Sequence, residues 1–388
     1  MSYELLGLRR VVNGVGPATR LGGLPLHPDV LTAMGEATRH NVRMDHLQDA
    51  AGRRLAALLD VPACYVTSGA AAALTLATAA AMAGDDPRLI DRLPEPGPRH
   101  EVVVQLAHRD PYDHAVTAAG ARLVTVGYPG STHPDELARA LTPATAAVLW
   151  RPGRDGDLLA LRTCAEIAHR HGVPVIVDGA LFVPPVDRLR SFLADGADLV
   201  AVSGGKGLRG PQASGLLCGR PDLVAAVGLH HQDMDERVGT WPHPGRSAHT
   251  RPDPPRHGIG RGMKVGREQL MGLLAAVERY LADPGRDDRP GIAELDAVAA
   301  ALAGHPAVAV GRHHDAGLDV PVLHLDLTAT GLPVDEVVRR LATGDPWVAL
   351  GEEAAWRGVL TVNPMALGEG DGAVLAAAVV AAVDGRTR

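Results

Sequence analysis

Lys206 stands in the stretch VSGGKGLRGPQ (residues 202–212), in which glycine occupies positions 204, 205 and 207. A lysine normally extends its charged head into water, so a stretch without neighbouring side chains suggests a lysine that works close to the backbone. The glycines would leave room for a flat, bulky group to approach it. A phosphate-binding P-loop is excluded, because that motif needs glycine where Val200 stands and Ser or Thr where Gly207 stands.

Asp178 is the second candidate for a catalytic or cofactor-binding residue. It ends the apolar run VPVIVD (residues 173–178), which predicts a strand. A further run, DLVAVSG (198–204), precedes Lys206, and a helical pattern at 186–196 separates the two runs. A right-handed crossover places the ends of both strands on one rim of a sheet. An acid and a lysine there suit pyridoxal 5'-phosphate (PLP): the lysine forms a Schiff base, and the carboxylate keeps the pyridinium nitrogen protonated.

A site for the phosphate of PLP is predicted in YVTSGAAAAL (residues 65–74), a strand followed by a turn and a helix start. Ser68, Gly69 and Ala70 stand where that helix begins, and the free N–H groups of a helix N-terminus bind phosphate. Ser203, three residues before Lys206, could add a hydroxyl. An ordinary helix cap would explain Ser68 alone, but it would not explain the order of all these features along the chain.

The group that stacks on the cofactor ring is sought in QLAHRDPYDHAV (residues 105–116), which follows another apolar run. We select His108 as the stacking and catalytic candidate, because it directly follows the predicted strand. Tyr112, which could also bind substrate, and His114 remain alternatives.

The elements that position these residues are predicted by short apolar runs that alternate with helical patterns. Strands are expected at 101–107, 122–127, 145–150, 173–178 and 198–204, and helices at 69–84, 112–119, 133–141, 163–172 and 186–196. This alternation is typical of an α/β fold with a mostly parallel sheet, whose ligands bind beyond the carboxyl ends of the strands. A helix at 267–283 leads to a second, smaller α/β unit after about residue 290.

The expected organisation is an N-terminal segment (1–45), a large cofactor-binding domain (46–265) and a connecting helix with a small C-terminal domain (266–388). Residues 230–262, rich in Pro, His, Arg and Gly, are predicted to form a lid loop over the substrate. Its histidines have irregular spacing and no accompanying cysteine or acid pair, so we predict no metal site. They are His230, His231, His243, His249 and His257.

Composition excludes several classes of protein. The net charge of −7 argues against a nucleic-acid partner, and no apolar run approaches the length of about 20 residues that spans a membrane. The N-terminus lacks the pattern of a secretory signal. The three cysteines are far apart and in no CxxC spacing, which indicates a reduced, cytoplasmic protein without structural disulfides or zinc.

Together these residues resemble the selenocysteine synthase-like branch of the fold-type I PLP enzymes, which includes D-glucosaminate-6-phosphate ammonia-lyase. The resemblance covers nearly the whole chain, and SGGKGLRGPQ (203–212) is its most specific element. Other matching stretches are VVNGVGPATRLGG (11–23), MDHLQDAAGRRLAALL (44–59) and YVTSGAAAALTLATAAAMAG (65–84). The resemblance implies a fold-type I architecture, with Lys206 as the Schiff-base lysine and Asp178 as the pyridinium partner.

The resemblance also implies a partner subunit and an arginine for the substrate carboxylate. Fold-type I sites are generally completed by a second subunit, so at least a homodimer is expected. Arg209, Arg261 and Lys264 are candidates for binding the phosphate or the substrate. Many enzymes of this fold type use an arginine of the C-terminal domain, but after Arg357 this chain has arginine only at its tail. Arg20 is therefore an alternative clamp.

Two departures from the family bear on the substrate. The stretch VDGALFVPP (177–185) carries Leu181 and Phe182 where smaller or acidic residues are usual, so the wall beside the cofactor is changed. The acidic chain starts close to the catalytic region, so a tRNA substrate is not expected. We predict a PLP enzyme that cleaves the Cα–H bond of an amino acid with β-elimination, as an ammonia-lyase or dehydratase does. An amino-acid racemase or epimerase, and a PLP-binding protein without turnover, are the alternatives.

Overall fold

The computed structural model describes residues 3–153, 156, 158–232, 235–237 and 257–385. It divides into two compact units, one formed by residues 26–278 and one by residues 1–25 together with 279–388. We expected boundaries after residues 45 and 265; the structure has its divisions at Pro25/Leu26 and Glu278/Arg279. Within the described residues, no helix combines the length and the apolar character that crossing a membrane requires.

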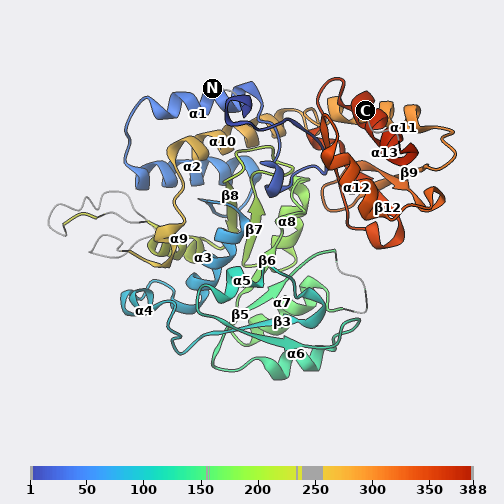
Figure 1. Ribbon diagram of the computed structural model, residues 1–388. Helices are drawn as coiled ribbons and strands as arrows, with labels where there is room; N and C mark the ends of the chain where they lie inside the picture. Colours follow the sequence, from blue (N-terminus) through green and yellow to red (C-terminus); the bar gives the residue numbers. More distant parts are fainter. Residues whose placement is uncertain (1–2, 154–155, 157, 233–234, 238–256, 386–388) are drawn as a thin grey trace. The chain divides into compact units, whose positions relative to one another are not determined.

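The unit of residues 26–278 is built on a seven-stranded sheet with the order β2-β8-β7-β6-β5-β3-β4 (Figure 1). Strand β8 runs opposite to the other six strands, which share one direction, so the expected mostly parallel sheet is confirmed. The strands are β2 (Cys64–Thr67), β3 (Glu101–Gln105), β4 (Arg122–Val126), β5 (Thr145–Trp150), β6 (Val175–Asp178), β7 (Leu199–Ser203) and β8 (Gly215–Gly219).

Helices cover both faces of this sheet. One layer contains α3 (Ala70–Ala83), α5 (Asp113–Thr117) and α9 (Pro221–His231), and the other contains α7 (Leu161–Arg170) and α8 (Val186–Ala194). The remaining helices of the unit are α1 (Pro28–Thr38), α2 (Met44–Leu59), α4 (Pro87–Arg92), α6 (Pro134–Ala140) and α10 (Arg267–Ala282), the last of which crosses the division between the units.

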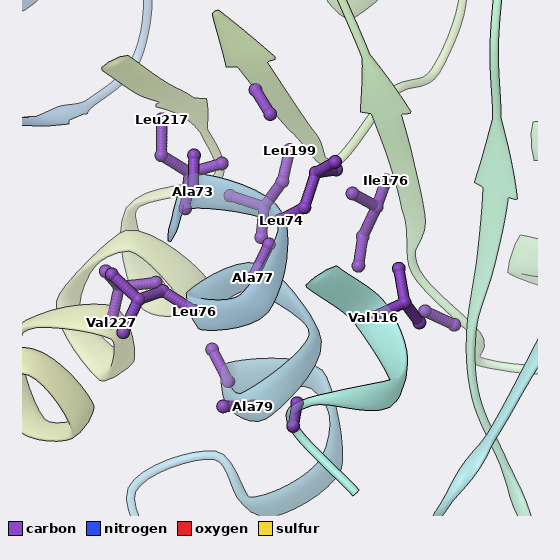
Figure 2. Close-up of a cluster of buried hydrophobic side chains, with 14 of the residues drawn as sticks. Ala73, Leu74, Leu76, Ala77, Ala79, Val116, Ile176, Leu199, Leu217 and Val227 are labelled. Atoms are coloured by element: carbon purple, nitrogen blue, oxygen red, sulfur yellow. The ribbon is translucent and has the colours of Figure 1, made fainter. Parts of the chain in front are cut away.

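Helix α3 forms the centre of the core because it is apolar around its whole circumference. Its small side chains, such as Ala73 and Ala77, allow it to lie close to the sheet, and Leu76 points toward Val227 of α9 (Figure 2). Ile176, Leu199 and Leu217 meet it from the strands. A chain with only 3% aromatic residues thus builds its core from short side chains packed at close range.

The second unit combines two small sheets. Strand β1 (Val11–Gly14) pairs in parallel with β11 (Trp347–Leu350), and β10 (Val320–Asp326) lies between β9 (Ala309–Asp315) and β12 (Val359–Val362) in an antiparallel sheet. Helices α11 (Arg289–Leu302), α12 (Val334–Thr343) and α13 (Asp371–Asp384) supply the rest of its core. Because β1 joins this unit from the other end of the chain, residues 1–25 belong to it and do not form a separate segment.

The prediction that a lid loop begins at residue 230 is wrong. Helix α9 continues through His230 and His231, which are buried (0% and 9% exposed). Nδ1 of His231 accepts a hydrogen bond from the hydroxyl of Tyr65, and Nε2 donates one to the carbonyl of Met263. These two histidines therefore pack in the core. His243, His249 and most of the predicted lid lie outside the described residues.

Candidate active site

Polar residues lie at or just after the carboxyl ends of four neighbouring strands, at one rim of the large sheet. Strands β3, β5, β6 and β7 are adjacent and parallel, so their carboxyl ends share that rim. His108 lies just beyond β3, Arg151 follows β5 directly, Asp178 ends β6, and Ser203 ends β7 three residues before Lys206. The crossover from β6 through α8 to β7 thus brings Asp178 and the lysine loop to the same place, as the spacing predicts.

Lys206 lies in the loop between β7 and β8, which is folded back on itself by backbone hydrogen bonds. Its carbonyl accepts the N–H of Arg209 at 2.8 Å, and the carbonyl of Gly204 accepts the N–H of Gly210 at 2.8 Å. Arg209 adopts a left-handed backbone (φ 53°), which is unusual for a residue with a side chain and occurs most often at turns and functional sites.

The glycines around Lys206 allow neighbouring parts of the same protein to pack directly against the backbone of the lysine loop. A Cβ on Gly207 would lie 2.4 Å from Cδ of Pro184, and a Cβ on Gly204 would lie 2.3 Å from Oγ of Ser214. The expectation that these glycines open space for a ligand is therefore wrong. They allow the lysine loop to pack tightly against the segments around it.

Burial lowers the pKa of Lys206, and the negative charge of Asp178 opposes this change only in part. Within the described residues, the ammonium group makes no hydrogen bond or ion pair. A partly buried lysine without a hydrogen-bonded partner is costly as a structural element, because the charged form loses water with only partial compensation. The same surroundings favour the neutral amine, which is the nucleophilic form.

Asp178 is oriented by two donors. Oδ2 accepts Nε–H of Arg151 at 3.1 Å, and Oδ1 accepts the N–H of Ala180 at 3.3 Å. The side chain is 9% exposed. A carboxylate can accept about four hydrogen bonds, so Asp178 keeps acceptor capacity for a further donor.

Arg151 is the residue that the sequence analysis missed. Its side chain is 3% exposed and forms ion pairs with Asp178, with Asp113 at 2.9 Å and with Asp110 at 3.3 Å. Nη1 also donates to the carbonyl of His108. Burial lowers the pKa of Arg151, but the hydrogen bond to Asp113 and the charges of Asp178 and Asp110 outweigh burial and raise it overall. Its position immediately after the apolar run TAAVLW was the signal that could have found it.

His108 is more deeply buried than a stacking residue should be. It is 1% exposed, its Nδ1 accepts the backbone N–H of Arg151 at 3.2 Å, and its ring meets Trp150 edge-on. This burial counts against the stacking role, which stays a prediction. The alternatives are more accessible, since Tyr112 is 60% exposed and His114 is exposed as well.

The predicted phosphate site has the features of a helix N-terminus without a cap. Gly69 precedes α3 with φ 111°, no side chain caps the first turn, and a Cβ on Gly69 would meet nothing within 4 Å. The N–H groups of the first turn, which begins at Ala70, are therefore available to an anion. Ser68 instead donates a hydrogen bond from its hydroxyl to the carbonyl of Met263 at 3.1 Å. Ser203 is half-buried at the end of β7.

The basic candidates belong to different elements of the chain. Arg209 belongs to the lysine loop, and Arg261 lies half-buried in a short 3-10 helix (Ile259–Gly262), with Lys264 exposed after it. Arg20 belongs to the other unit, where it pairs with Glu352 at 3.6 Å. Which of them binds a substrate carboxylate stays a prediction. Among the described residues, no group of three or more His, Cys, Asp or Glu side chains could hold a metal ion.

Comparisons with known proteins identify the family, although no family model matches the chain. It is 35% identical to a 5'-C-glycyluridine monooxygenase-decarboxylase from a Streptomyces species, over 95% of this chain and 88% of that protein. It is 28% identical to a D-glucosaminate-6-phosphate ammonia lyase from Salmonella typhimurium, over 97% of this chain and 96% of that protein.

Solved structures agree with these relatives. A structure of D-glucosaminate-6-phosphate ammonia-lyase superimposes with a TM-score of 0.83 at 27% identity and covers 99% of this chain and 98% of that one. An N-succinyldiaminopimelate aminotransferase from Mycobacterium tuberculosis matches with a TM-score of 0.52 at 20% identity, over 98% of this chain and 94% of that one, which shows the fold. The chain therefore belongs to the selenocysteine synthase-like and D-glucosaminate-6-phosphate ammonia-lyase family of fold-type I PLP-dependent enzymes.

Proposed function

We propose that this protein binds PLP through Lys206 and cleaves the Cα–H bond of an amino acid, with loss of a substituent from Cβ. The observation that carries the proposal is the pair formed by Lys206 and Asp178 at the ends of adjacent parallel strands. Lys206 has no partner in the described structure, and Asp178 has spare acceptor capacity. The uncapped start of α3 fits the phosphate of the same cofactor.

The residues divide the chemical work. PLP, when bound, supplies an electron sink for the bond that breaks at Cα. Asp178 would hold the proton on the ring nitrogen, because a nearby opposite charge favours the charged form. Lys206 would take the Cα proton at Nζ, and burial favours the neutral amine that this step requires. Tyr112 or His114, both exposed, are candidates for protonating the group that leaves Cβ.

In this reaction the Cα–H bond and the bond from Cβ to its substituent break, and the substituent leaves with a proton. Water then releases ammonia and leaves a 2-oxo acid. A racemase would instead return a proton to Cα on the opposite face, with no loss of atoms. Both reactions exchange the Cα proton with solvent, so deuterium incorporation alone does not separate them.

A second candidate function is oxygen-dependent decarboxylation, which is favoured by the identity of 35% to a monooxygenase-decarboxylase. That class of reaction breaks the bond between Cα and the carboxylate and releases CO2. The substrate is oxidised at Cα, which takes one atom of O2 and becomes an amide carbon, and the other oxygen atom leaves as water. Oxygen uptake with release of CO2 therefore distinguishes it from elimination, which needs no oxygen.

The experiment is a panel of amino acids incubated with PLP-loaded enzyme in D2O, with and without oxygen. The panel contains D and L forms of β-hydroxy amino acids, sugar amino acids and amino acids without a leaving group at Cβ. A 2-oxo acid and ammonia from the substituted substrates alone, with or without oxygen, support elimination. Inversion with deuterium at Cα and no oxo acid overturns elimination in favour of racemisation, and CO2 release that requires oxygen overturns it in favour of the second candidate. No turnover by a PLP-loaded protein supports a binding protein without catalysis.

We also propose that the protein acts as at least a homodimer, because sites of this fold type are generally completed by a second subunit. Light scattering of the PLP-loaded protein at assay concentration tests this. A mass of at least two chains is expected from a chain of 40.4 kDa, and an active species with the mass of one chain would refute it.

A further inference from the structure

Arg151 connects two segments that approach the rim from different strands. From the end of β5 it reaches the carboxylate of Asp178 at the end of β6 with Nε. With Nη1 it reaches Asp113 on α5 and the carbonyl of His108 beyond β3. The contact of Nη2 with Asp110 is an ion pair without a well-aligned hydrogen bond. One buried guanidinium thus ties the end of β6 to the segment that follows β3.

The position of Arg151 is fixed in turn by Asp113. Asp113 accepts from both Arg151 and Arg109, and Arg109 stands four residues earlier on the same segment. Burial raises the pKa of Asp113, but the hydrogen bonds from Arg109 and Arg151 lower it overall, so this carboxylate stays charged. Asp113 therefore fixes Arg151, and Arg151 fixes Asp178.

Two guanidinium groups, those of Arg109 and Arg151, contact three carboxylates, those of Asp110, Asp113 and Asp178. The hydrogen bond from Nε of Arg151 to Oδ2 therefore fixes the direction in which the Asp178 carboxylate points.

We propose that Arg151 is a positioning residue that sets the orientation of the Asp178 carboxylate toward the ring nitrogen of PLP, with Asp113 as its anchor. This inference rests on the proposed cofactor and on the role of Asp178. Arg151 acts through Asp178 and does not contact the reacting atoms. Asp113 acts one step further away, through Arg151.

A double-mutant cycle on PLP affinity tests this dependence. The dissociation constant of PLP is measured for wild type, Arg151→Met, Asp178→Asn and the double variant. If Arg151 works through Asp178, each single substitution weakens binding by about tenfold, and the double variant binds as weakly as Asp178→Asn alone. Independent effects that multiply in the double variant would overturn the proposal.

The visible absorption band of PLP at saturating concentration provides a readout that general damage to the fold would not mimic. Arg151→Met should shift this band in the same direction as Asp178→Asn, with no additional shift in the double variant. Arg151→Lys, which keeps the charge but cannot span Asp178 and Asp113 together, should be intermediate in both affinity and band position. A wild-type band in Arg151→Met would overturn the proposal.

Two further variants distinguish loss of the proposed positioning from general misfolding. Asp113→Asn removes the anchor without touching Arg151, and it should weaken PLP binding and shift the band in the same direction but by less. Arg220→Met is the matched control, because Arg220 pairs with the buried Asp198 just before the start of β7, at the opposite rim. It should leave the dissociation constant of PLP within twofold of wild type.

The outcome also separates failure of this inference from failure of the proposed function. If wild type shows no visible band with PLP that depends on Lys206, the proposed cofactor is wrong and the inference falls with it. If wild type has the band and Arg151→Met has the same affinity and band as wild type, only the inference is wrong.

Discussion

Asp178→Asn is the substitution that most directly probes the electronics of the proposed site. The side chain is 9% exposed, so water screens its charge little. A neighbouring carboxylate stabilises a cationic group by about 1–3 pK units, or roughly 1.4–4 kcal/mol. If that stabilisation is expressed fully in the transition state, its loss slows turnover by about 10- to 1000-fold.

The fold should tolerate this change better than the reaction does. Asparagine keeps an oxygen that can accept Nε–H of Arg151, and Arg151 retains its ion pairs with Asp113 and Asp110. We therefore expect the midpoint of thermal unfolding to fall by only a few degrees, since about 1 kcal/mol corresponds to roughly 2–4 °C for a unit of this size.

The assay is single-turnover kinetics at saturating PLP, followed by product formation and deuterium exchange at Cα. Asp222→Asn is the matched control, because Asp222 also pairs with an arginine but is 63% exposed. It should react at the wild-type rate. Turnover of Asp178→Asn within twofold of wild type, with PLP fully bound, would refute the role of Asp178.

Two more substitutions probe the lysine and its loop. Lys206→Met in the protein without PLP should raise the midpoint temperature of unfolding near pH 7. Burial lowers the pKa of Lys206, so keeping this lysine protonated destabilises the folded state. That gain should shrink as the pH rises through the lowered pKa toward the ordinary value of 10.5, and a gain that is constant with pH would contradict the reasoning. Gly207→Ala should displace the lysine loop and abolish PLP binding, because its Cβ would lie 2.4 Å from Cδ of Pro184. The control Gly35→Ala, whose Cβ would meet nothing within 4 Å, should bind PLP normally, and normal binding by both variants would count against the tight loop.

The sequence predicts the parallel part of the fold well because each of its strands has a strong local signal. The runs that end at Trp150 and Asp178 coincide with β5 and β6 to within two residues at either end. The same pattern placed Asp178 and Lys206 at strand ends, and the parallel topology then brought them to one rim. Strand β8 was not predicted, because GLLCG follows the lysine loop without an intervening helix and pairs antiparallel.

Tertiary features account for the rest of what the sequence analysis missed. Arg151 resembles a surface arginine in the sequence, because its three acidic partners lie between 27 and 41 residues away and only the fold brings them together. His230 and His231 were assigned to a lid by composition, although the apolar helix α9 carries them into the core. Strand β1 finds its partner β11 more than three hundred residues later, which local periodicity does not reveal.

The central claim is that Lys206 is the residue that binds PLP covalently. The most direct measurement is borohydride reduction of the PLP-treated protein, followed by mass spectrometry of its peptides. We expect one pyridoxyl group, attached to Lys206, and loss of both the attachment and the visible band in Lys206→Ala. Attachment at Lys264, the only other lysine of the chain, or a visible band and turnover that persist in Lys206→Ala, would contradict it.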